Sequence, residues 1–155
     1  MDVRFMKEAL AEARLAAEAG EVPVGAVIVR NGEILARACN TREKEQNALH
    51  HAEILAINRA CEKLGSWRLS DCTLYVTLEP CPMCGGAILN ARVGRVVYGA
   101  KDASMGVFGS VLNYNAYPLG YKPEVLSGVC EEESRILMQE FFRLCREKKK
   151  GKKPQ

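Results

Sequence analysis

The chain has 155 residues, of which 48% are apolar and 26% are charged, a composition typical of one globular domain. No stretch approaches the length of a membrane span, and the charged segment 1–8 is not a secretory signal, so we expect a cytoplasmic protein. Seven cysteines fit a reducing compartment better than a disulfide scaffold, and a net charge of +3 does not by itself indicate nucleic-acid binding.

The spacing of apolar residues and the position of turn residues predict helices that alternate with strands. Recurrence at three and four residues indicates the helices, and short apolar runs bounded by glycine, proline or asparagine indicate the strands. The expected elements are helix 3–19, strands 22–30 and 33–39, loop 40–49, helix 50–64, strand 73–77, helix 82–91, strand 95–99, a connection over 101–123 with a short helical piece around 107–112, strand 123–127 and helix 131–148.

Capping and turn residues support these boundaries. Asp2 can cap the first helix and Gly20 can end it, while Gly65 closes the second helix. The pair Asn31-Gly32 predicts a tight hairpin turn. Helices that alternate with apolar strands imply an α/β fold in which one sheet lies between helices.

We expect one folded domain over 1–147 and a basic, disordered tail over 148–155. No internal repeat or linker divides the chain. Lys and Arg crowd the C-terminal end, where they could contact phosphates or simply form a solvated end.

The most informative pattern joins His51 and Glu53 to a Pro-Cys-x-x-Cys segment that contains Cys81 and Cys84. One imidazole and two thiolates can hold zinc, and three ligands leave a fourth position open for water, as in catalytic zinc sites. His-x-Glu followed by Pro-Cys-x-x-Cys is the signature of zinc-dependent nucleobase deaminases, so this assignment rests on a matched motif. A Cys-x-x-Cys pair alone would be weak evidence, because buried cysteines are common.

Both parts of the motif fall at predicted transitions from a strand or loop into a helix. Cys81 and Cys84 would share one face of a first helical turn, and the positive end of a helix favours thiolates. His51 also lies near a helix start, so two helix N-termini are expected to converge on one metal ion. His50 competes for the metal, but only His51 has the His-x-Glu spacing.

Glu53 is the expected proton carrier. Two thiolates offset the charge of Zn²⁺ and weaken its acidity, so a nearby base is needed. Glu53 would take a proton from the activated water and deliver protons to a ring nitrogen and a departing amine. The product would carry a carbonyl in place of the amino group, and ammonia would be released. Asn40 is either an ordinary loop residue or a pocket residue that contacts a base edge.

The chain also matches a known family over nearly its whole length, in segments 21–27, 51–53, 77–84, 98–102 and 141–143 and at Asn40. These segments resemble the bacterial tRNA-specific adenosine deaminases. His-Ala-Glu and Pro-Cys-x-Met-Cys are shared by the wider cytidine deaminase-like superfamily, whereas Tyr-Gly-Ala-Lys-Asp and Phe-Phe-Arg are more specific to the tRNA enzymes. The match is loose over 43–50 and 113–122, which leaves the contacts with an anticodon loop open.

This resemblance implies a three-layer α/β/α sandwich with a central mixed sheet of about five strands. It also implies a zinc-dependent hydrolase that forms a homodimer, binds one Zn²⁺ per chain and converts the wobble adenosine of a tRNA anticodon to inosine. The roles implied by motif position are zinc binding for His51, Cys81 and Cys84, proton transfer for Glu53, contact with the flipped-out base for Asn40, contact with the neighbouring nucleotide for Asp102, and anticodon binding for Phe142 and Arg143.

The two adjacent phenylalanines of the last helix are expected to differ in exposure. They point about 100° apart on a helix. Phe141 lies on the apolar stripe and is expected in the core, which leaves Phe142 near the surface beside Arg143. An exposed aromatic beside cations suits the stacking of single-stranded RNA. Packing of Phe142 against another helix or a dimer partner is the alternative.

Two other functions remain open at this point. A deaminase of a free nucleobase or nucleoside, of guanine or cytosine type, would have the same zinc motif. A non-catalytic, zinc-stabilised RNA-binding module would have no need for Glu53 or for an open metal position. The predicted partners are a tRNA anticodon stem-loop and a second copy of the chain, without a membrane.

Overall fold

A single mixed sheet organises the part of the chain that the computed structural model describes, residues 1–151. Its strand order is β2-β1-β3-β4-β5. β1 is antiparallel to β2 and to β3, whereas β3, β4 and β5 run parallel. Within 1–151 the five strands are β1 (Gly25–Arg30), β2 (Glu33–Cys39), β3 (Cys72–Leu78), β4 (Arg95–Ala100) and β5 (Glu124–Ser127).

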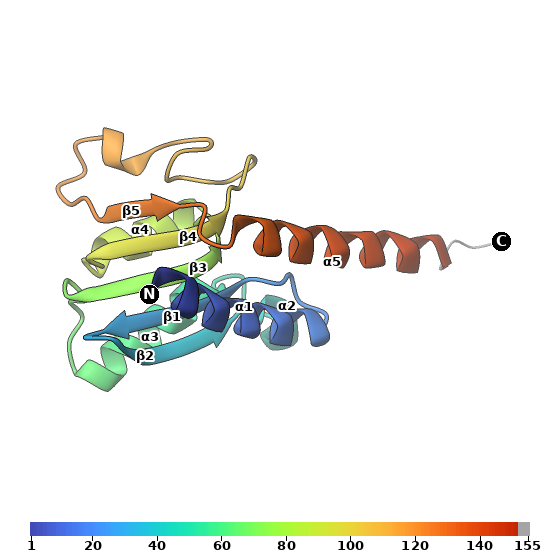
Figure 1. Cartoon of the computed structure of the whole chain (residues 1–155), viewed down its shortest axis with the longest axis horizontal. Helices are drawn as coiled ribbons and strands as arrows, with labels where there is room; N and C mark the ends of the chain where they lie inside the picture. The colour runs from blue at the N-terminus through green and yellow to red at the C-terminus, as the bar shows by residue number, and fades with distance from the viewer. Residues whose placement is uncertain (152–155) are drawn as a thin grey trace.

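Helices cover both faces of this sheet, so the architecture is the predicted three-layer α/β/α sandwich (Figure 1). α1 and the start of α5 pack on one face, and α3 and α4 pack on the other. The far end of α5 projects beyond the sheet. The helices are α1 (Asp2–Glu18), α2 (Arg42–Glu45), α3 (Ala52–Leu64), α4 (Pro82–Asn90), the 3₁₀ helix η1 (Tyr114–Ala116) and α5 (Glu131–Gly151).

The central strands read as continuous apolar runs because both of their faces are buried. In β1, Val27 and Val29 pack into the layer of α1, while Ala26 and Ile28 pack into the layer of α3 and α4. This alternation follows from the two-residue period of a strand. Gly25 begins β1 where α1 passes so closely that a Cβ would lie 2.1 Å from the carbonyl oxygen of Ala9.

The predicted order of the main elements is confirmed, and two turn predictions are confirmed with it. Asn31 and Gly32 have φ angles of 50° and 77°, as a tight hairpin turn requires. Gly65 ends α3 in the left-handed conformation with φ 62°. None of the helices described within 1–151 is both long and apolar enough to cross a membrane.

Three local predictions are wrong. The expected loop 40–49 contains the short helix α2, and the expected helical piece at 107–112 is absent from the described structure, where the 3₁₀ helix lies further on at Tyr114–Ala116. Asp2 does not cap α1, whose N-cap is Met1. Its carboxylate instead accepts hydrogen bonds from the Arg95 guanidinium at 2.8 Å and 2.9 Å and from the Tyr75 hydroxyl at 2.7 Å.

The last helix is longer than predicted. It continues to Gly151, so the first residues of the expected tail, 148–151, are helical. Three glutamates begin this helix and three lysines lie in its last turn, which suits the helix dipole. The rest of the expected tail, 152–155, lies outside the described residues.

The contact between Asp2 and Arg95 ties α1 to β4, and we expect Asp2→Asn to lower the free energy of unfolding by about 1–2 kcal/mol. The Arg95 hydrogen bond lowers the pKa of Asp2 from 3.8 to about 2. Because the folded pKa lies below the ordinary value, this stabilisation is present above pH 3.8 and is lost as the pH falls through about 2.

Thermal melts of the wild type and of Asp2→Asn at several pH values test this expectation. The difference in melting temperature should be full near neutral pH and should shrink toward pH 2. Glu33→Gln, which removes an exposed carboxylate from the hairpin, is the control and should melt like the wild type. Equal melting of all three proteins at neutral pH would contradict the assigned role of Asp2.

Candidate active site

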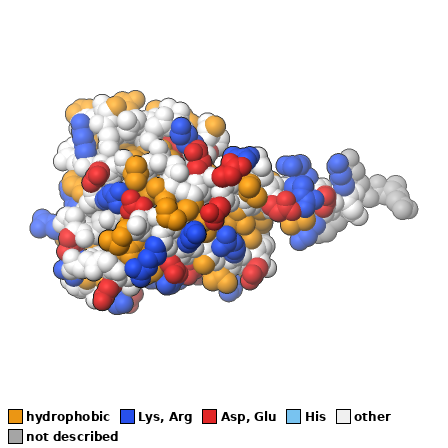
Figure 2. All heavy atoms as spheres, in the orientation of Figure 1, with side chains coloured by type: hydrophobic (Ala, Val, Ile, Leu, Met, Phe, Trp, Pro, Cys, Tyr) orange, Lys and Arg blue, Asp and Glu red, His pale blue; other side chains and the backbone are white. Residues whose placement is uncertain are grey.

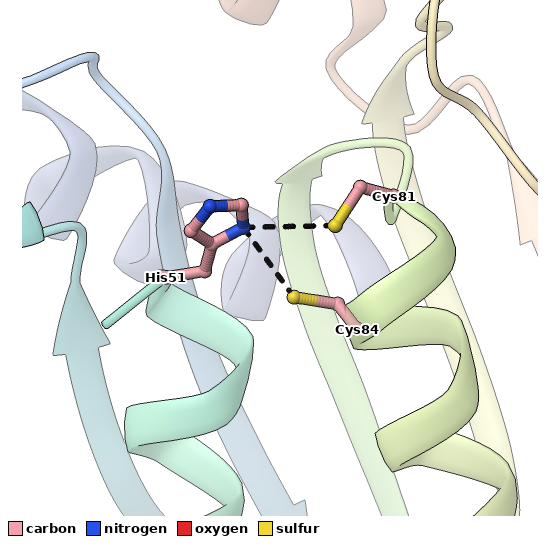
Figure 3. A group of neighbouring side chains, drawn as sticks. All are labelled: His51, Cys81 and Cys84. Atoms are coloured by element: carbon pink, nitrogen blue, oxygen red, sulfur yellow. Dashed lines mark hydrogen bonds between the residues drawn. The ribbon is translucent and has the colours of Figure 1, made fainter. Parts of the chain in front are cut away.

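The side chains of His51, Cys81 and Cys84 meet where two helices begin (Figure 3). His51 is the N-cap residue of α3 and Cys81 is the N-cap residue of α4, both with extended backbone angles. An N-cap side chain ordinarily bonds the first amides of its helix, but neither of these two does so in the described structure. Cys84 follows three residues after Cys81, on the same face of the first turn.

The distances within this cluster fit a tetrahedral zinc ion. The Sγ atoms of Cys81 and Cys84 each lie 3.6 Å from Nδ1 of His51. For a tetrahedral ion with Zn–S of about 2.3 Å and Zn–N of about 2.0–2.1 Å, the S···N separation is about 3.5–3.6 Å. All three donor atoms lie within 4.8 Å of one another. The cluster could therefore hold a metal ion without rearrangement of the chain.

The structure selects His51 over His50 as the histidine of the cluster. Nδ1 of His50 lies 3.4 Å from a carboxylate oxygen of Glu45, and His50 is not part of the cluster. Nδ1 of His51 faces both sulfur atoms. The His-x-Glu spacing thus identified the histidine that the structure brings to Cys81 and Cys84.

The cluster favours negative charge on sulfur. A hydrogen bond from Cys84, and a further one from His51, lower the pKa of the Cys81 thiol to about 4. The same hydrogen bond to Cys81, together with burial, raises the pKa of Cys84. The hydrogen bond to Cys81 also raises the pKa of His51. Protein groups alone therefore stabilise one thiolate, and a bound cation would favour the second.

Glu53 lies beside the cluster, in the first turn of α3, and is only 3% exposed. Burial raises the pKa of its carboxyl to about 7, and the nearby Cys81 thiolate adds to this effect. A carboxyl that titrates near neutral pH can both accept and donate a proton. Among the described residues, the group that could hold a metal ion consists of His51, Cys81 and Cys84.

A pocket of about 520 Å³ opens over the cluster. Its lining includes His51, Cys81 and Glu53, and also Asn40 and Asp102 from two different loops. Apolar side chains form much of the remaining wall, among them Val22, Val24, Ala48 and Met83. A mostly apolar pocket with a few polar groups at one end is typical of a small-molecule or base-binding site.

Asn40 and Asp102 are held by their own hydrogen bonds. Nδ2 of Asn40 donates to the carbonyl oxygen of Val22 at 3.3 Å, and its Oδ1 accepts from the amide of Arg42 at 3.1 Å. Oδ1 of Asp102 accepts from the amides of Ser104 and Met105 at 3.0 Å and 3.1 Å. Both side chains therefore have fixed orientations at the pocket wall.

A second hollow of about 1160 Å³ separates α5 from the loop that follows β4. Phe142 and Arg143 line it, and it shares Arg42 and Asp102 with the first pocket. Phe142 is 42% exposed, as predicted. Its ring packs edge-to-face against that of Phe141, with 5.4 Å between the ring centroids. Phe141 is partly buried rather than fully in the core. Lys and Arg side chains also follow the projecting end of α5 (Figure 2).

Two buried carboxylates near the pocket were not predicted from the sequence. Glu21 is 1% exposed and Glu79 is 2% exposed. Glu21 accepts hydrogen bonds from the amides of Glu43 and Lys44 at 2.9 Å and 3.0 Å, and so caps α2. Glutamate is almost never fully buried without partners, but its burial leaves no local pattern in the sequence. The available signal was that each glutamate directly precedes a proline-containing segment whose residues line the pocket.

Comparison with known proteins agrees with this site. Residues 2–146 match the model of the MafB19-like deaminase family. A tRNA-specific adenosine deaminase of Bacillus subtilis (strain 168) is 53% identical over 151 residues, which cover 97% of this chain and 94% of that protein.

Two solved structures are similar as well. One, from a study of A-to-I editing by tRNA:A34 deaminases at the wobble position of transfer RNA, is 45% identical with a TM-score of 0.84, and the match covers 86% of this chain and 98% of that chain. A guanine deaminase from Bacillus subtilis is 39% identical with a TM-score of 0.62, over 77% of this chain and 76% of that one. On the strength of the longer and closer matches, this chain belongs to the family of tRNA-specific adenosine deaminases.

Proposed function

We propose that this protein is a zinc-dependent hydrolase that converts the wobble adenosine of a tRNA anticodon to inosine and releases ammonia. The observation that carries the proposal is the 53% identity, over 97% of the chain, to a tRNA-specific adenosine deaminase. The His, Cys, Cys cluster beside a buried glutamate supplies the chemistry that such a reaction needs.

His51, Cys81 and Cys84 would hold one Zn²⁺ per chain, in the geometry that their 3.6 Å N···S distances already fit. When bound, the ion would supply Lewis-acid activation of a water molecule at the pocket floor. The imidazole and the thiolates act only as ligands in this scheme, and they take no part in moving protons.

Glu53 would move the protons. Its carboxylate accepts a proton from the attacking water as oxygen bonds to C6 of adenine. It then donates that proton to the ring nitrogen next to C6, and it transfers the second proton of the water, from the hydroxyl now on C6, to the exocyclic amine. The C6–N bond breaks, a carbonyl remains at C6 and ammonia leaves. The raised pKa of about 7 suits a group that must both accept and donate near neutral pH.

The two hollows together suit a nucleotide that is part of a longer strand. A base must leave its stack to enter the pocket, where Asn40 would contact its edge and Asp102 the neighbouring nucleotide. Phe142 and Arg143 would contact the rest of the anticodon loop along the second hollow. Arg42 links the two hollows, which makes it an additional candidate for a phosphate contact.

Three wider assignments belong to the same proposal. Residues 1–147 form a single zinc-dependent deaminase domain. The protein acts as a homodimer, as the resemblance of its sequence to the tRNA-specific adenosine deaminases implies. A cytoplasmic location fits both a tRNA substrate and the seven cysteines, all of which lie in the described residues and are free.

Release of ammonia from defined substrates tests the reaction. We expect turnover, with inosine as the product, on a short anticodon hairpin that carries adenosine at the wobble position. The same adenosine within a duplex stem should react far more slowly, because extrusion of a paired base costs a few kcal/mol. Turnover of free guanine or cytosine without turnover of the hairpin would instead identify a nucleobase deaminase. Hairpin binding without any ammonia release would identify a non-catalytic module.

Cys84→Ala should abolish stoichiometric zinc binding, because the remaining two ligands cannot hold the ion at normal affinity. Elemental analysis of purified protein measures the zinc content per chain, and circular dichroism monitors the fold. Cys61→Ala, which removes a partly buried cysteine outside the cluster, is the control and should retain one zinc ion per chain. Full zinc occupancy in Cys84→Ala would refute the ligand assignment.

Glu53→Ala should retain zinc and fold but lose turnover by roughly 10²–10⁴-fold, the usual contribution of a general acid–base group. Single-turnover assays on the hairpin measure the loss, and elemental analysis measures the metal. Glu62→Ala, which removes an exposed glutamate from the same helix, should turn over like the wild type. Loss of zinc in Glu53→Ala would show instead that Glu53 is a ligand.

A further inference from the structure

Glu79 lies in the short segment between the end of β3 and the metal-cluster residue Cys81. It is 2% exposed, and none of the ion pairs found within residues 1–151 includes it. A buried carboxylate without a counter-ion is costly unless several hydrogen bonds stabilise its charge. The hydrogen-bond partners of Glu79 therefore indicate which part of the structure its carboxylate stabilises.

All of the side-chain partners of Glu79 come from one loop. Oε1 accepts from the amide of Asp102 at 3.1 Å and from the hydroxyl of Ser110. Oε2 accepts from the amides of Phe108 and Ser110 at 3.0 Å and 3.1 Å. Hydrogen bonds from amides to a carboxylate are stronger than those between neutral groups. The Glu79 side chain thus binds residues at both ends of the loop 102–110.

The loop closes tightly around this carboxylate. A Cβ placed on Gly106 would lie 2.3 Å from Cδ of Glu79 and 2.4 Å and 2.5 Å from its two oxygens, so no larger residue fits without displacing one of them. The main chain adds two links, from the amide of Glu79 to the carbonyl of Ala100 at 2.9 Å and from the amide of Val107 to the carbonyl of Pro80 at 3.1 Å. The segment that leads into Cys81 and the loop therefore form one unit.

This unit places part of the pocket wall. Asp102 and Met105, both in the loop, line the pocket. The amide of Asp102 is bound by Glu79, and the carboxylate of Asp102 in turn binds the amide of Met105. The position of both side chains relative to the metal cluster thus depends on a carboxylate only two residues from Cys81.

We propose that Glu79 is a positioning residue of the deamination reaction, which holds the wall formed by the loop 102–110 at a fixed place relative to the metal ligands. The inference rests on the proposed function and assigns Glu79 a role in substrate binding rather than in proton transfer. The charge is required as well as the shape, because the NH₂ group of a glutamine at this position would face at least one of the four N–H and O–H donors.

Glu79→Gln tests this role in the full-length zinc-loaded protein. With the wall displaced, we expect the KM for the anticodon hairpin to rise about tenfold while kcat stays within about threefold, the pattern of lost binding without lost chemistry. Zinc content should remain at the wild-type level. Trypsin should also cleave faster after Lys101, which is exposed and directly precedes the loop.

Asp2→Asn is the matched control, because Asp2 is also a carboxylate with several hydrogen bonds but lies at the opposite end of the strands. It should lower the melting temperature without changing the KM or the cleavage after Lys101. Two further variants keep the test from depending on the folding of Glu79→Gln alone. Gly106→Ala, which pushes the loop away from the other side, should also raise the KM. Ser110→Ala, which leaves the three amide donors in place, should change it less than threefold.

A Glu79→Gln protein with a lowered melting temperature but wild-type KM and wild-type cleavage after Lys101 would overturn the proposal, because Glu79 would then be purely structural. Loss of zinc in this variant would overturn it too, since Glu79 would act on the metal cluster. If the wild type does not turn over the hairpin, the proposed function fails. The rate of trypsin cleavage after Lys101 would still show whether Glu79 orders the loop.

Discussion

The meeting of two helix N-termini is the constraint on which the site depends. α3 and α4 lie on the same face of the sheet, and their N-cap residues, His51 and Cys81, point toward each other. Each helix end carries partial positive charge, so two ends at one point repel unless negative charge lies between them. The Cys81 thiolate supplies that charge. The sandwich fold creates a place where thiolates are favoured, and a cation can then bind to them.

Sequence patterns predicted the elements that local interactions determine. The periodicity of apolar residues predicted α1 and α3, and Asn31-Gly32 predicted the hairpin turn. The two-residue spacing between His51 and Glu53 distinguished His51 from His50. Two of the errors share one physical cause, a hydrogen bond between a carboxylate and a partner far away in the sequence. Asp2 bonds Arg95, 93 residues away, instead of capping its own helix. The amides that begin α2 bond Glu21, 22 and 23 residues away, so residues 40–49 alone gave no sign of a helix.

The same kind of interaction shapes the pocket on two sides. Glu21 holds α2, and Arg42, the first residue of this helix, lines both hollows. Glu79 holds the loop that carries Asp102. These walls depend on buried charge and amide hydrogen bonds, whereas the sheet and its helices depend on apolar packing. The walls can therefore differ between enzymes without disturbing the fold or the metal cluster. The similar fold of a guanine deaminase, at 39% identity, is consistent with that separation.

The charge of the second hollow explains how a protein of modest net charge could hold RNA. The formal charge of the whole chain is only +3, but Arg135, Arg143 and Arg146 line one groove along α5. Arg143 is paired with Glu140 and Glu147 of its own helix, and all three side chains are about half exposed. Exposed pairs of this kind are weak because water and salt screen them. A phosphate could therefore replace either glutamate beside Arg143 at small cost.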